Sequence, residues 1–275
     1  LLARREEYPA ELPDGVLVLT CGVDTQDDRL EFEVVGHGHF GETWGIKKGI
    51  IMGRPDNPDV WAALDDVLEH IYIFADGIGL RISMTFVDEG GHFTQEVRQA
   101  CRERIGKKVF AIKGMDGADR PFTGPPKQQK IVMRKVIIGY CWVYHLGVDA
   151  GKQIIMDNIK VKTPGPRYCH FPRRDDYGPA YFAGLMSERL EYDPKKKNPW
   201  VWKKIPGHER NEALDCRNYA MAAFKVLPAD LDAIDARLKA ARGQAPRLSA
   251  PAPAPKRPVT QTRRGTALDK YYDDW

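Results

Sequence analysis

The sequence predicts an α/β fold in which helices flank one mixed β-sheet, and three observations support this class. Residues 17–24 form a short apolar run that ends in Asp24, as expected for a strand buried on both faces. After a polar turn, apolar side chains recur at every second position over residues 30–34, which is typical of an antiparallel partner strand. Two further apolar runs, 82–87 and 109–112, alternate with helical patterns, and this alternation favours parallel pairing.

The remaining elements follow from residue spacing and from turn residues. A third strand is predicted around residues 42–46, and a loop rich in Gly, Pro, Asn and Asp follows at 49–58. Apolar residues at helical spacing predict a helix over 60–71, with Asp59 as its N-cap, and a second helix over 94–104. Further along the chain we expect a loop at 115–129, a strand at 136–146, a strand end and helix within 147–159, an irregular basic segment at 164–179, a helix over 181–192, a strand or hairpin at 200–202, and a long helix over 211–226.

Composition and charge describe an ordinary globular chain with a mild basic bias. The 275 residues are 43% hydrophobic and 29% charged, and the formal net charge of +4 permits nucleic-acid binding without requiring it. The five cysteines are scattered and form no C-x-x-C pair, so neither a disulfide framework nor a structural zinc site is expected. A reducing intracellular compartment fits this cysteine usage best. No run is long and apolar enough for a membrane span.

Three carboxylates occupy special positions in the predicted fold. Asp24 and Asp88 each end a core strand, and Asp215 lies on the helix over 211–226. Neighbouring strands lie about 5 Å apart, and a helix packed across their ends can bring a third acid to the same point. Acids at such distances repel unless cations neutralise them, and oxygen ligands favour Mg²⁺ or Mn²⁺. Two such ions can activate water and stabilise the leaving oxygen in phosphodiester hydrolysis.

Alternatives remain for several side chains near these acids. Asp24 could serve only to cap a turn, and Glu212 shares a helix face with Asp215, which we prefer as the third ligand. Lys113 ends the third core strand, where it would contact the scissile phosphate or damp the repulsion; the alternative is a plain surface lysine. The histidine spacings fit no zinc pattern, although His92 is expected at the mouth of the site.

Basic side chains in the middle part of the chain supply candidate DNA contacts. They can meet phosphates but form no base-reading motif, so DNA binding is expected to be weak, non-specific and salt-dependent. The sequence contains no G-x-x-x-x-G-K-[ST] phosphate loop, and ATP binding of that kind is not expected. The candidate contacts are Lys113, Lys127, Lys130, Arg134, Arg167, Arg173, Arg174 and the lysines at 195–197.

The composition changes in the last part of the chain. Residues 229–242 predict one more helix, and residues 243–262 are rich in Ala, Pro and basic residues, as in a flexible linker. Residues 268–275 are aromatic and acidic, which suits a docking peptide; an inert tail is the alternative. The sequence therefore divides into an entry segment at 1–12, a domain at 13–228, and a C-terminal helix, Pro/Ala-rich linker and docking tail at 229–275.

Five motifs, taken in order, resemble one protein family. They are residues 22–31 (GVDTQDDRLE), 87–92 (VDEGGH), 111–114 (AIKG), 170–172 (HFP) and 211–216 (NEALDC). Together they resemble the C-terminal nuclease domain of the large terminase subunits of tailed bacteriophages, of the lambda GpA-like type. The likeness runs from about residue 12 to residue 226, and five ordered motifs are far more specific than any one of them.

The resemblance implies a ribonuclease-H-like fold and a metal-dependent endonuclease that cuts concatemeric double-stranded DNA during genome packaging. By motif, Asp24, Asp88 and Asp215 would bind two Mg²⁺ or Mn²⁺ ions, and Lys113 would be a site lysine. A packaging ATPase domain would precede residues 1–12, which would then be a linker. The implied partners are a small terminase subunit, which chooses the DNA sequence, and a portal protein, which the tail would contact; the implied location is the host cell cytoplasm.

Two other interpretations stay open at this point. A junction resolvase or a transposase with the same fold would also be a DNA enzyme. A non-catalytic DNA-binding or assembly module of the packaging motor would instead use the acids only for structure. Binding of Mn²⁺ between Asp24 and Asp88 separates the enzyme from the module, because the module has no reason to hold a metal there.

Overall fold

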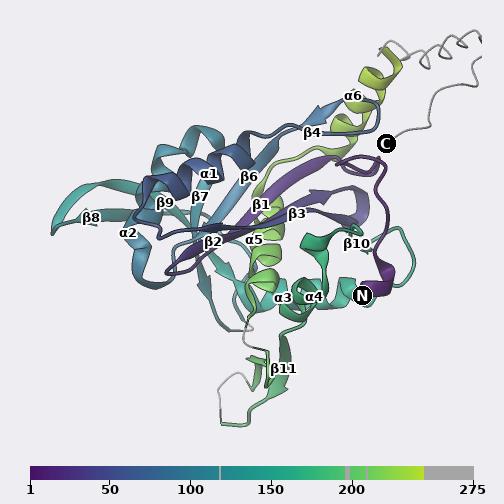
Figure 1. The fold of residues 1–275 in the computed structure, drawn as a ribbon. Helices are drawn as coiled ribbons and strands as arrows, with labels where there is room; N and C mark the ends of the chain where they lie inside the picture. Colours follow the sequence, from purple (N-terminus) through teal and green to yellow (C-terminus); the bar gives the residue numbers. More distant parts are fainter. Residues whose placement is uncertain (118, 196–198, 209, 245–275) are drawn as a thin grey trace, which may run out of the picture. The chain divides into compact units, whose positions relative to one another are not determined.

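An eight-stranded mixed sheet lies at the centre of the computed structural model (Figure 1). Its strands follow the order β10-β3-β2-β1-β6-β7-β9-β8. The chain divides into two units, and the fold described below belongs to the first, Leu1–Gly243. The lysines at 196 and 197 and the predicted linker and tail beyond residue 244 lie outside the described residues. The structure describes residues 1–117, 119–195, 199–208 and 210–244.

The antiparallel half of the sheet begins at β1 (Val18–Thr25), which is buried along its whole length. β1 pairs with β2 (Arg29–His37), and β2 pairs in turn with β3 (Thr43–Met52). The two-residue strand β10 (Cys169–His170) lies parallel to β3 at this edge. β3 extends well into the segment predicted as a loop because its residues as far as Met52 pair with β2.

The parallel half of the sheet extends from the other side of β1. β6 (Ile82–Asp88) pairs with β1, β7 (Val109–Met115) with β6, and β9 (Val136–Gly147) with β7, all in parallel. β8 (Lys127–Met133) closes this edge antiparallel to β9. β1 therefore joins an antiparallel half to a parallel half, and the predicted mixed sheet flanked by helices is confirmed, in an arrangement consistent with a ribonuclease-H-like fold.

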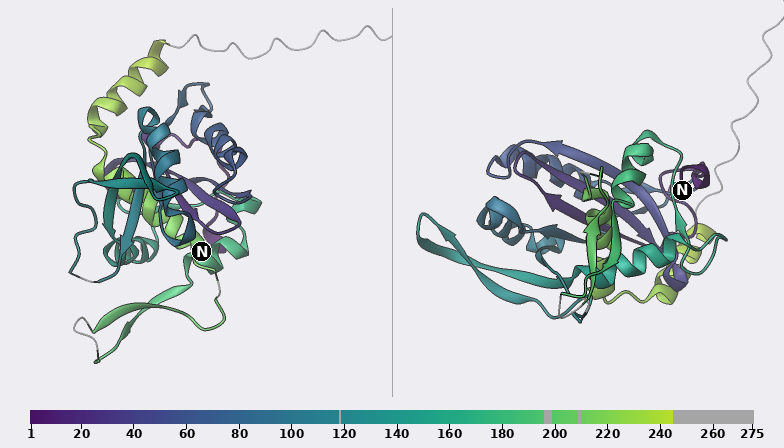
Figure 2. Two further views of the ribbon diagram at one scale, coloured as in Figure 1. Left: turned by 90° about the vertical axis from the view of Figure 1, so that its left-hand side faces the viewer. Right: turned by 90° about the horizontal axis from the view of Figure 1, so that it is seen from below.

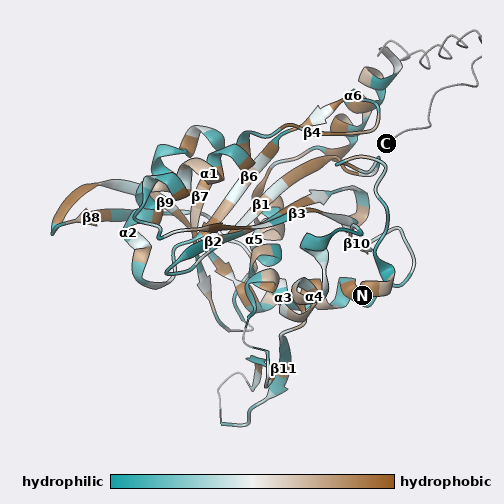
Figure 3. Cartoon of the chain, in the orientation of Figure 1, coloured by the Kyte–Doolittle hydropathy of each residue, from teal (hydrophilic) through white to brown (hydrophobic). Residues whose placement is uncertain are grey.

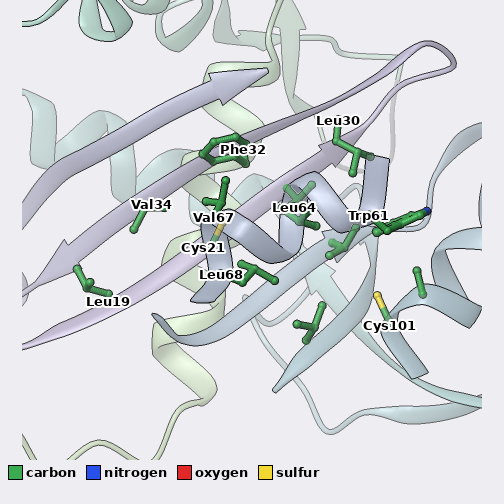
Figure 4. Packing of buried hydrophobic residues seen from close by; sticks show 14 of the residues in the cluster. Leu19, Cys21, Leu30, Phe32, Val34, Trp61, Leu64, Val67, Leu68 and Cys101 are labelled. Atoms are coloured by element: carbon green, nitrogen blue, oxygen red, sulfur yellow. The ribbon is translucent and has the colours of Figure 1, made fainter. Parts of the chain in front are cut away.

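Helices cover both faces of the sheet (Figure 2). α1 (Pro58–Glu69) and α2 (Thr94–Glu103) share one buried cluster with β1 and β2, and Figure 4 shows their side chains in that contact. The opposite face carries α5 (Glu212–Val226), against which α3 (Val148–Ile159) and α4 (Pro179–Leu185) pack. Hydrophobic residues accordingly concentrate in the central strands (Figure 3).

Shorter elements connect and extend this framework. α6 (Leu231–Gln244) follows α5 and agrees with the helix predicted at 229–242. Two small hairpins lie outside the main sheet: β4 (Tyr72–Ile73) pairs with β5 (Gly79–Leu80), and β11 (Glu188–Tyr192) pairs with β12 (Trp200–Lys204). Single 3-10 turns occur at Leu2–Arg4, His39–Gly41, Gly91–Phe93, Ile105–Lys107 and Asp175–Tyr177.

The long helix α5 lies directly on β1 because Gly22 has no side chain. A Cβ atom at Gly22 would lie 1.9 Å from the carbonyl oxygen of Cys216 and 2.5 Å from the backbone nitrogen of Ala220. Two positions earlier on the same face, the Thr20 hydroxyl donates a hydrogen bond to the Ala220 carbonyl at 2.7 Å. These contacts fix how far along β1 the helix sits, and they set its first turn beside the end of that strand.

The structure corrects the helix predicted over 181–192. α4 ends at Leu185, and the following residues form β11, paired residue by residue with β12. Along β11, Glu188, Leu190 and Tyr192 alternate with charged residues, which is the two-residue period of a strand. The helical pattern of α4 directly precedes β11, and the sequence prediction extended that helix through the strand.

Two smaller predictions also change. The N-cap of α1 is Asn57, not Asp59: the Asn57 side chain accepts a hydrogen bond from the backbone nitrogen of Asp59 at 3.0 Å, and Pro58 takes the first helical position. β8 starts at Lys127, inside the loop predicted to run to residue 129. Its mostly polar sequence gives an edge strand little hydrophobic signal.

The first residues of the chain pack against the domain. Leu12 is fully buried in the main core, and the Arg4 guanidinium donates to the Ile159 carbonyl at 2.7 Å. A β-bridge joins Glu6 to Pro172. Each of the five cysteines is a buried free thiol. Among the described helices, none combines the length and hydropathy that a membrane span requires.

Candidate active site

The sheet brings Asp24 and Asp88 to its carboxyl edge on the face that α5 covers. Thr20 and Gly22 touch α5, and Asp24 continues the same alternation, so it points to this face. Asp88 is the last residue of β6, two positions after Phe86, which packs in one cluster with residues of α5. Asp215 stands in the first turn of α5. The three predicted acids thus meet where two neighbouring strands end and one helix begins.

The charges of these acids act on one another. Burial, together with the charges of Asp215 and Asp88, raises the pKa of Asp24 to about 8. Burial and the charge of Asp215 raise the pKa of Asp88 to about 7, although the backbone N–H group of Gly90 favours its ionised form. Burial raises the pKa of Asp215 to about 6, against the opposing charge of Lys152. A cation bound between the acids would reduce this repulsion and favour their ionised forms.

In the absence of divalent ions, raising the pH should therefore destabilise the chain. All three pKa values lie above the value of about 4 that the unfolded chain has, so the folded chain holds extra protons. Their contribution to stability is complete below pH 4 and is lost as the pH rises through 6 to 8. In EDTA, we expect the melting temperature to fall by several degrees between pH 5 and pH 9.

The matched variants for this measurement are Asp24→Asn and Asp66→Asn. Asp66 is exposed on α1, across the sheet from α5, and its substitution should leave the slope unchanged. Asp24→Asn should flatten it, because the carboxylate with the highest of the three pKa values is gone. Parallel curves for wild type and Asp24→Asn would show that the pKa of Asp24 is not raised in the folded chain.

An open depression of about 410 Å³ lies beside two of the acids. His92 reaches it, as predicted, and its Nδ1 atom lies 2.9 Å from Asp27 Oδ1. A Cβ atom at Gly90 would lie 2.7 Å from Asp88 Oδ2, so this glycine leaves the carboxylate room at the rim. The depression is lined by Asp24, Thr25, Gln26, Asp27, Asp28, Asp88, Gly90, Gly91 and His92.

A lysine does lie at the acid cluster, but it is Lys152 of α3. Its Nζ atom is 3.5 Å from Asp215 Oδ1 and 2.7 Å from Glu188 Oε2. The Asn211 side chain donates to the other oxygen of Asp215 at 2.7 Å and to Glu188 at 2.8 Å. Burial lowers the pKa of Lys152, but the charges of Asp215 and Glu188 outweigh it and raise that pKa overall. Asp215 is thus held in place by two donors.

Sequence reasoning missed this group, although one signal was present. Lys152 occurs in a helical pattern with Val148, Ile155 and Ile159, so its spacing places it on the buried face of the helix. A lysine on such a face needs an acidic partner. Glu188 gave no comparable signal, because the segment that contains it was predicted as a helix.

The structure does not bring Lys113 to the three aspartates. Ile112 is the register partner of Asp88, and the next residue, Lys113, points to the opposite face of the sheet, where it is exposed. Glu212 is buried, and its Oε1 atom accepts a hydrogen bond from Arg29 at 2.8 Å. It adds to the charge around Asp24, but less than Asp215 does.

The candidate DNA contacts are split between the two edges of the sheet. Lys127 and Lys130 lie exposed on β8, and Arg134 follows them in the turn to β9. The other three lie near β10 at the far edge, where Arg174 pairs with Asp176 at 2.9 Å. In that group, Arg173 lies 3.5 Å from Glu7, and Arg167 donates to Asn158. These six residues therefore form no single basic surface.

Within the described ranges, no three His, Cys, Asp or Glu side chains stand in an arrangement that would already hold a metal ion. Both oxygens of Asp215 are engaged by Lys152 and Asn211, and the Gln26 side chain donates to Asp24. The donor set at the sheet edge still consists of carboxylates alone, which suits Mg²⁺ or Mn²⁺ better than zinc. Ligation would require rotation of these side chains.

A mixed sheet with acids at the ends of β1 and β6, and a third acid on the helix that crosses β1, defines a ribonuclease-H-like domain with an acidic edge site. The family model described as "Terminase large subunit gpA, endonuclease domain" matches residues 1–236. The chain belongs to this family, and the resemblance found in its motifs is confirmed.

Two curated relatives are similar over the same part of the chain. The terminase large subunit of Escherichia phage lambda is 31% identical over 231 residues, which are 81% of this chain and 34% of the relative. The terminase large subunit of Enterobacteria phage P21 is 30% identical over 233 residues, 82% of this chain and 35% of the relative. The chain thus spans about a third of the length of these relatives. No solved structure gave a significant match.

Proposed function

We propose that this chain is a metal-dependent endodeoxyribonuclease that cuts concatemeric double-stranded DNA during phage genome packaging. The observation that carries the proposal is the set of three mutually repelling aspartates, Asp24, Asp88 and Asp215, at one edge of the sheet in a member of an endonuclease-domain family. A purely structural role would be better served by neutral side chains, because buried like charges destabilise a fold.

Asp24, Asp88 and Asp215 would hold two Mg²⁺ or Mn²⁺ ions, which when bound activate a water molecule and stabilise the leaving oxygen. The protein's own groups prepare this arrangement. Lys152 and Asn211 orient the Asp215 carboxylate, and the amide of Gly90 orients Asp88. The depression beside Asp24 and Asp88 is open to solvent and gives a phosphodiester room to approach. Asp215, rather than Glu212, is proposed as the third ligand, because its charge acts more strongly on Asp24 than the charge of Glu212 does.

The proposal includes the partners that the family implies. Double-stranded DNA is the substrate, and Lys127, Lys130 and Arg134, which are exposed at the β8 edge, are among the proposed phosphate contacts. Sequence choice would come from a small terminase subunit, and the tail beyond residue 244 would contact a portal protein. A packaging ATPase domain of the same full-length protein would act with this domain in the host cell cytoplasm. Lys113 lies outside the acid cluster and is not proposed as catalytic.

The test is nicking of supercoiled plasmid by the purified chain in Mn²⁺, in Mg²⁺ and in EDTA, at low salt. We expect relaxed and linear products with either ion and none in EDTA, since the carboxylates alone cannot activate water. Raised salt should weaken the reaction steeply, because phosphate contacts dominate DNA binding. Nicking that persists in EDTA, or DNA binding without any cleavage in Mn²⁺, would contradict the proposal; the second outcome would favour a non-catalytic packaging module.

A further inference from the structure

The hairpin formed by β11 and β12, named here the arm (Glu188–Tyr192 and Trp200–Lys204), is rooted in the acid cluster. Its first residue, Glu188, accepts hydrogen bonds from Lys152 and Asn211, the two side chains that hold Asp215. On the second strand, the charge of Lys204 acts on Asp215. From this root the arm projects away from the main sheet (Figures 1 and 2). A ligand that lies along the arm would therefore reach the acid cluster at the root of the arm.

One face of the arm carries a ladder of paired side chains that is charged at its root and apolar and aromatic beyond it. Residues opposite each other in an antiparallel pair share a face, so the rungs are the pairs Glu188 with Lys204, Leu190 with Trp202, and Tyr192 with Trp200. The outermost rung is the most exposed: Tyr192 is 60% and Trp200 52% accessible. Their rings meet edge to face with centroids 5.3 Å apart. The ladder thus runs from the acid cluster outward to two exposed rings.

The charges of the arm are largely neutralised within it. Arg189 lies 2.7 Å from Glu191, and Lys203 lies within 4 Å of both Glu191 and Asp193. These ion pairs leave little unpaired charge on that part of the two strands, whereas the exposed Lys195 follows β11 in the connecting segment. What the two strands offer to a ligand is ring surface, and ring surface stacks on nucleobases.

We infer that the arm binds DNA by stacking Tyr192 and Trp200 on unpaired bases, and so guides a strand or strand end toward the acid cluster. This inference rests on the proposed function, because it takes DNA to be the substrate of the site. A closed duplex shows aromatic side chains only base edges and phosphates, whereas single strands, frayed ends and flipped nucleotides expose base faces. The aromatic outer part of the ladder matches the second class of DNA.

The experiment measures fluorescence anisotropy of a labelled single-stranded oligonucleotide and of the matching blunt duplex, with the whole chain in EDTA. For the double variant Tyr192→Ala, Trp200→Ala, we expect affinity for the single strand to fall about tenfold or more, given the usual contribution of one stacked base. Affinity for the duplex should change less than about twofold. The conservative double variant Tyr192→Phe, Trp200→Phe should retain most single-strand binding, because it keeps the rings.

Phe40→Ala is the matched control. Phe40 is an exposed aromatic residue, 78% accessible, near the far edge of the sheet, and its removal should change neither affinity. Because the measurement needs no cleavage, it tests the arm even if the chain nicks no plasmid. The inference is overturned if the double variant binds single strands as wild type does, or if single-strand and duplex binding fall equally. Unchanged single-strand binding would indicate that the ladder contacts a protein partner. An equal loss of single-strand and duplex binding would indicate that the arm contacts DNA of either kind.

Discussion

Replacing Gly22 by alanine is expected to destabilise the domain strongly and to abolish its proposed nuclease activity. The added methyl group would lie 1.9 Å from a backbone carbonyl oxygen and 2.5 Å from a backbone nitrogen of α5, and neither can rotate away. The helix must move off β1, at a cost of roughly 3 kcal/mol, the upper part of the usual range for overpacking. For a domain of this size that loss lowers the melting temperature by about 6–12 °C. Thermal unfolding and plasmid nicking measure the two effects.

Gly106→Ala is the matched control for this substitution. A Cβ atom at Gly106 meets nothing within 4 Å, and its backbone is not in the left-handed region. The same chemical change should therefore leave stability and cleavage near wild type. A Gly22→Ala protein as stable and active as Gly106→Ala would show that α5 does not need this close approach to carry Asp215 to the site.

Asp24→Asn, Asp88→Asn and Asp215→Asn should each reduce metal-dependent cleavage at least about a thousandfold, because each would remove a charged ligand whose contribution to the transition state is several kcal/mol. The melting temperature in EDTA should stay the same or rise, since each change removes one charge from a repelling set. Asp66→Asn serves as the surface control. The measurement is the initial nicking rate in Mn²⁺ beside a melting curve.

Glu212→Gln completes this set. If Asp215 is the third ligand, Glu212→Gln should keep substantial activity, although it loses its ion pair with Arg29. Near-normal cleavage by Asp215→Asn, together with loss in Glu212→Gln, would move the ligand role to Glu212. Near-normal cleavage by Asp24→Asn would reject the metal site as proposed.

The central part of the fold was predictable because burial on two faces leaves a direct signal in sequence. The run at 17–24, the run at 82–87 and the helix at 211–226 all appear close to where they were predicted. β8 and β11 were not predicted, because they pair at the edge or outside the main sheet, where few side chains are buried and local pairing decides the structure.

The residues of the site also divide into those that the sequence could predict and those that it could not. Asp24 and Asp88 could be found because each ends a recognisable buried strand, and Asp215 because its helix is strongly patterned. The partnership of Lys152 with Glu188 depends on how α3 packs beside the arm, which no local pattern shows. Lys113 illustrates the opposite limit. Its strand was predicted, although β7 runs two residues further, to Met115, but the face that each residue takes depends on the register with β6.

The three aspartates stand far apart along the chain: one near its start, one a third of the way along, and one on the last helix that crosses the sheet. During synthesis on the ribosome, a nascent chain therefore completes β1 and β6 long before α5 has emerged. Until then it has two of the three acids and no helix to close over them. Truncated or half-made products should not cut DNA, so cutting activity should appear only in molecules whose domain has been fully translated and folded.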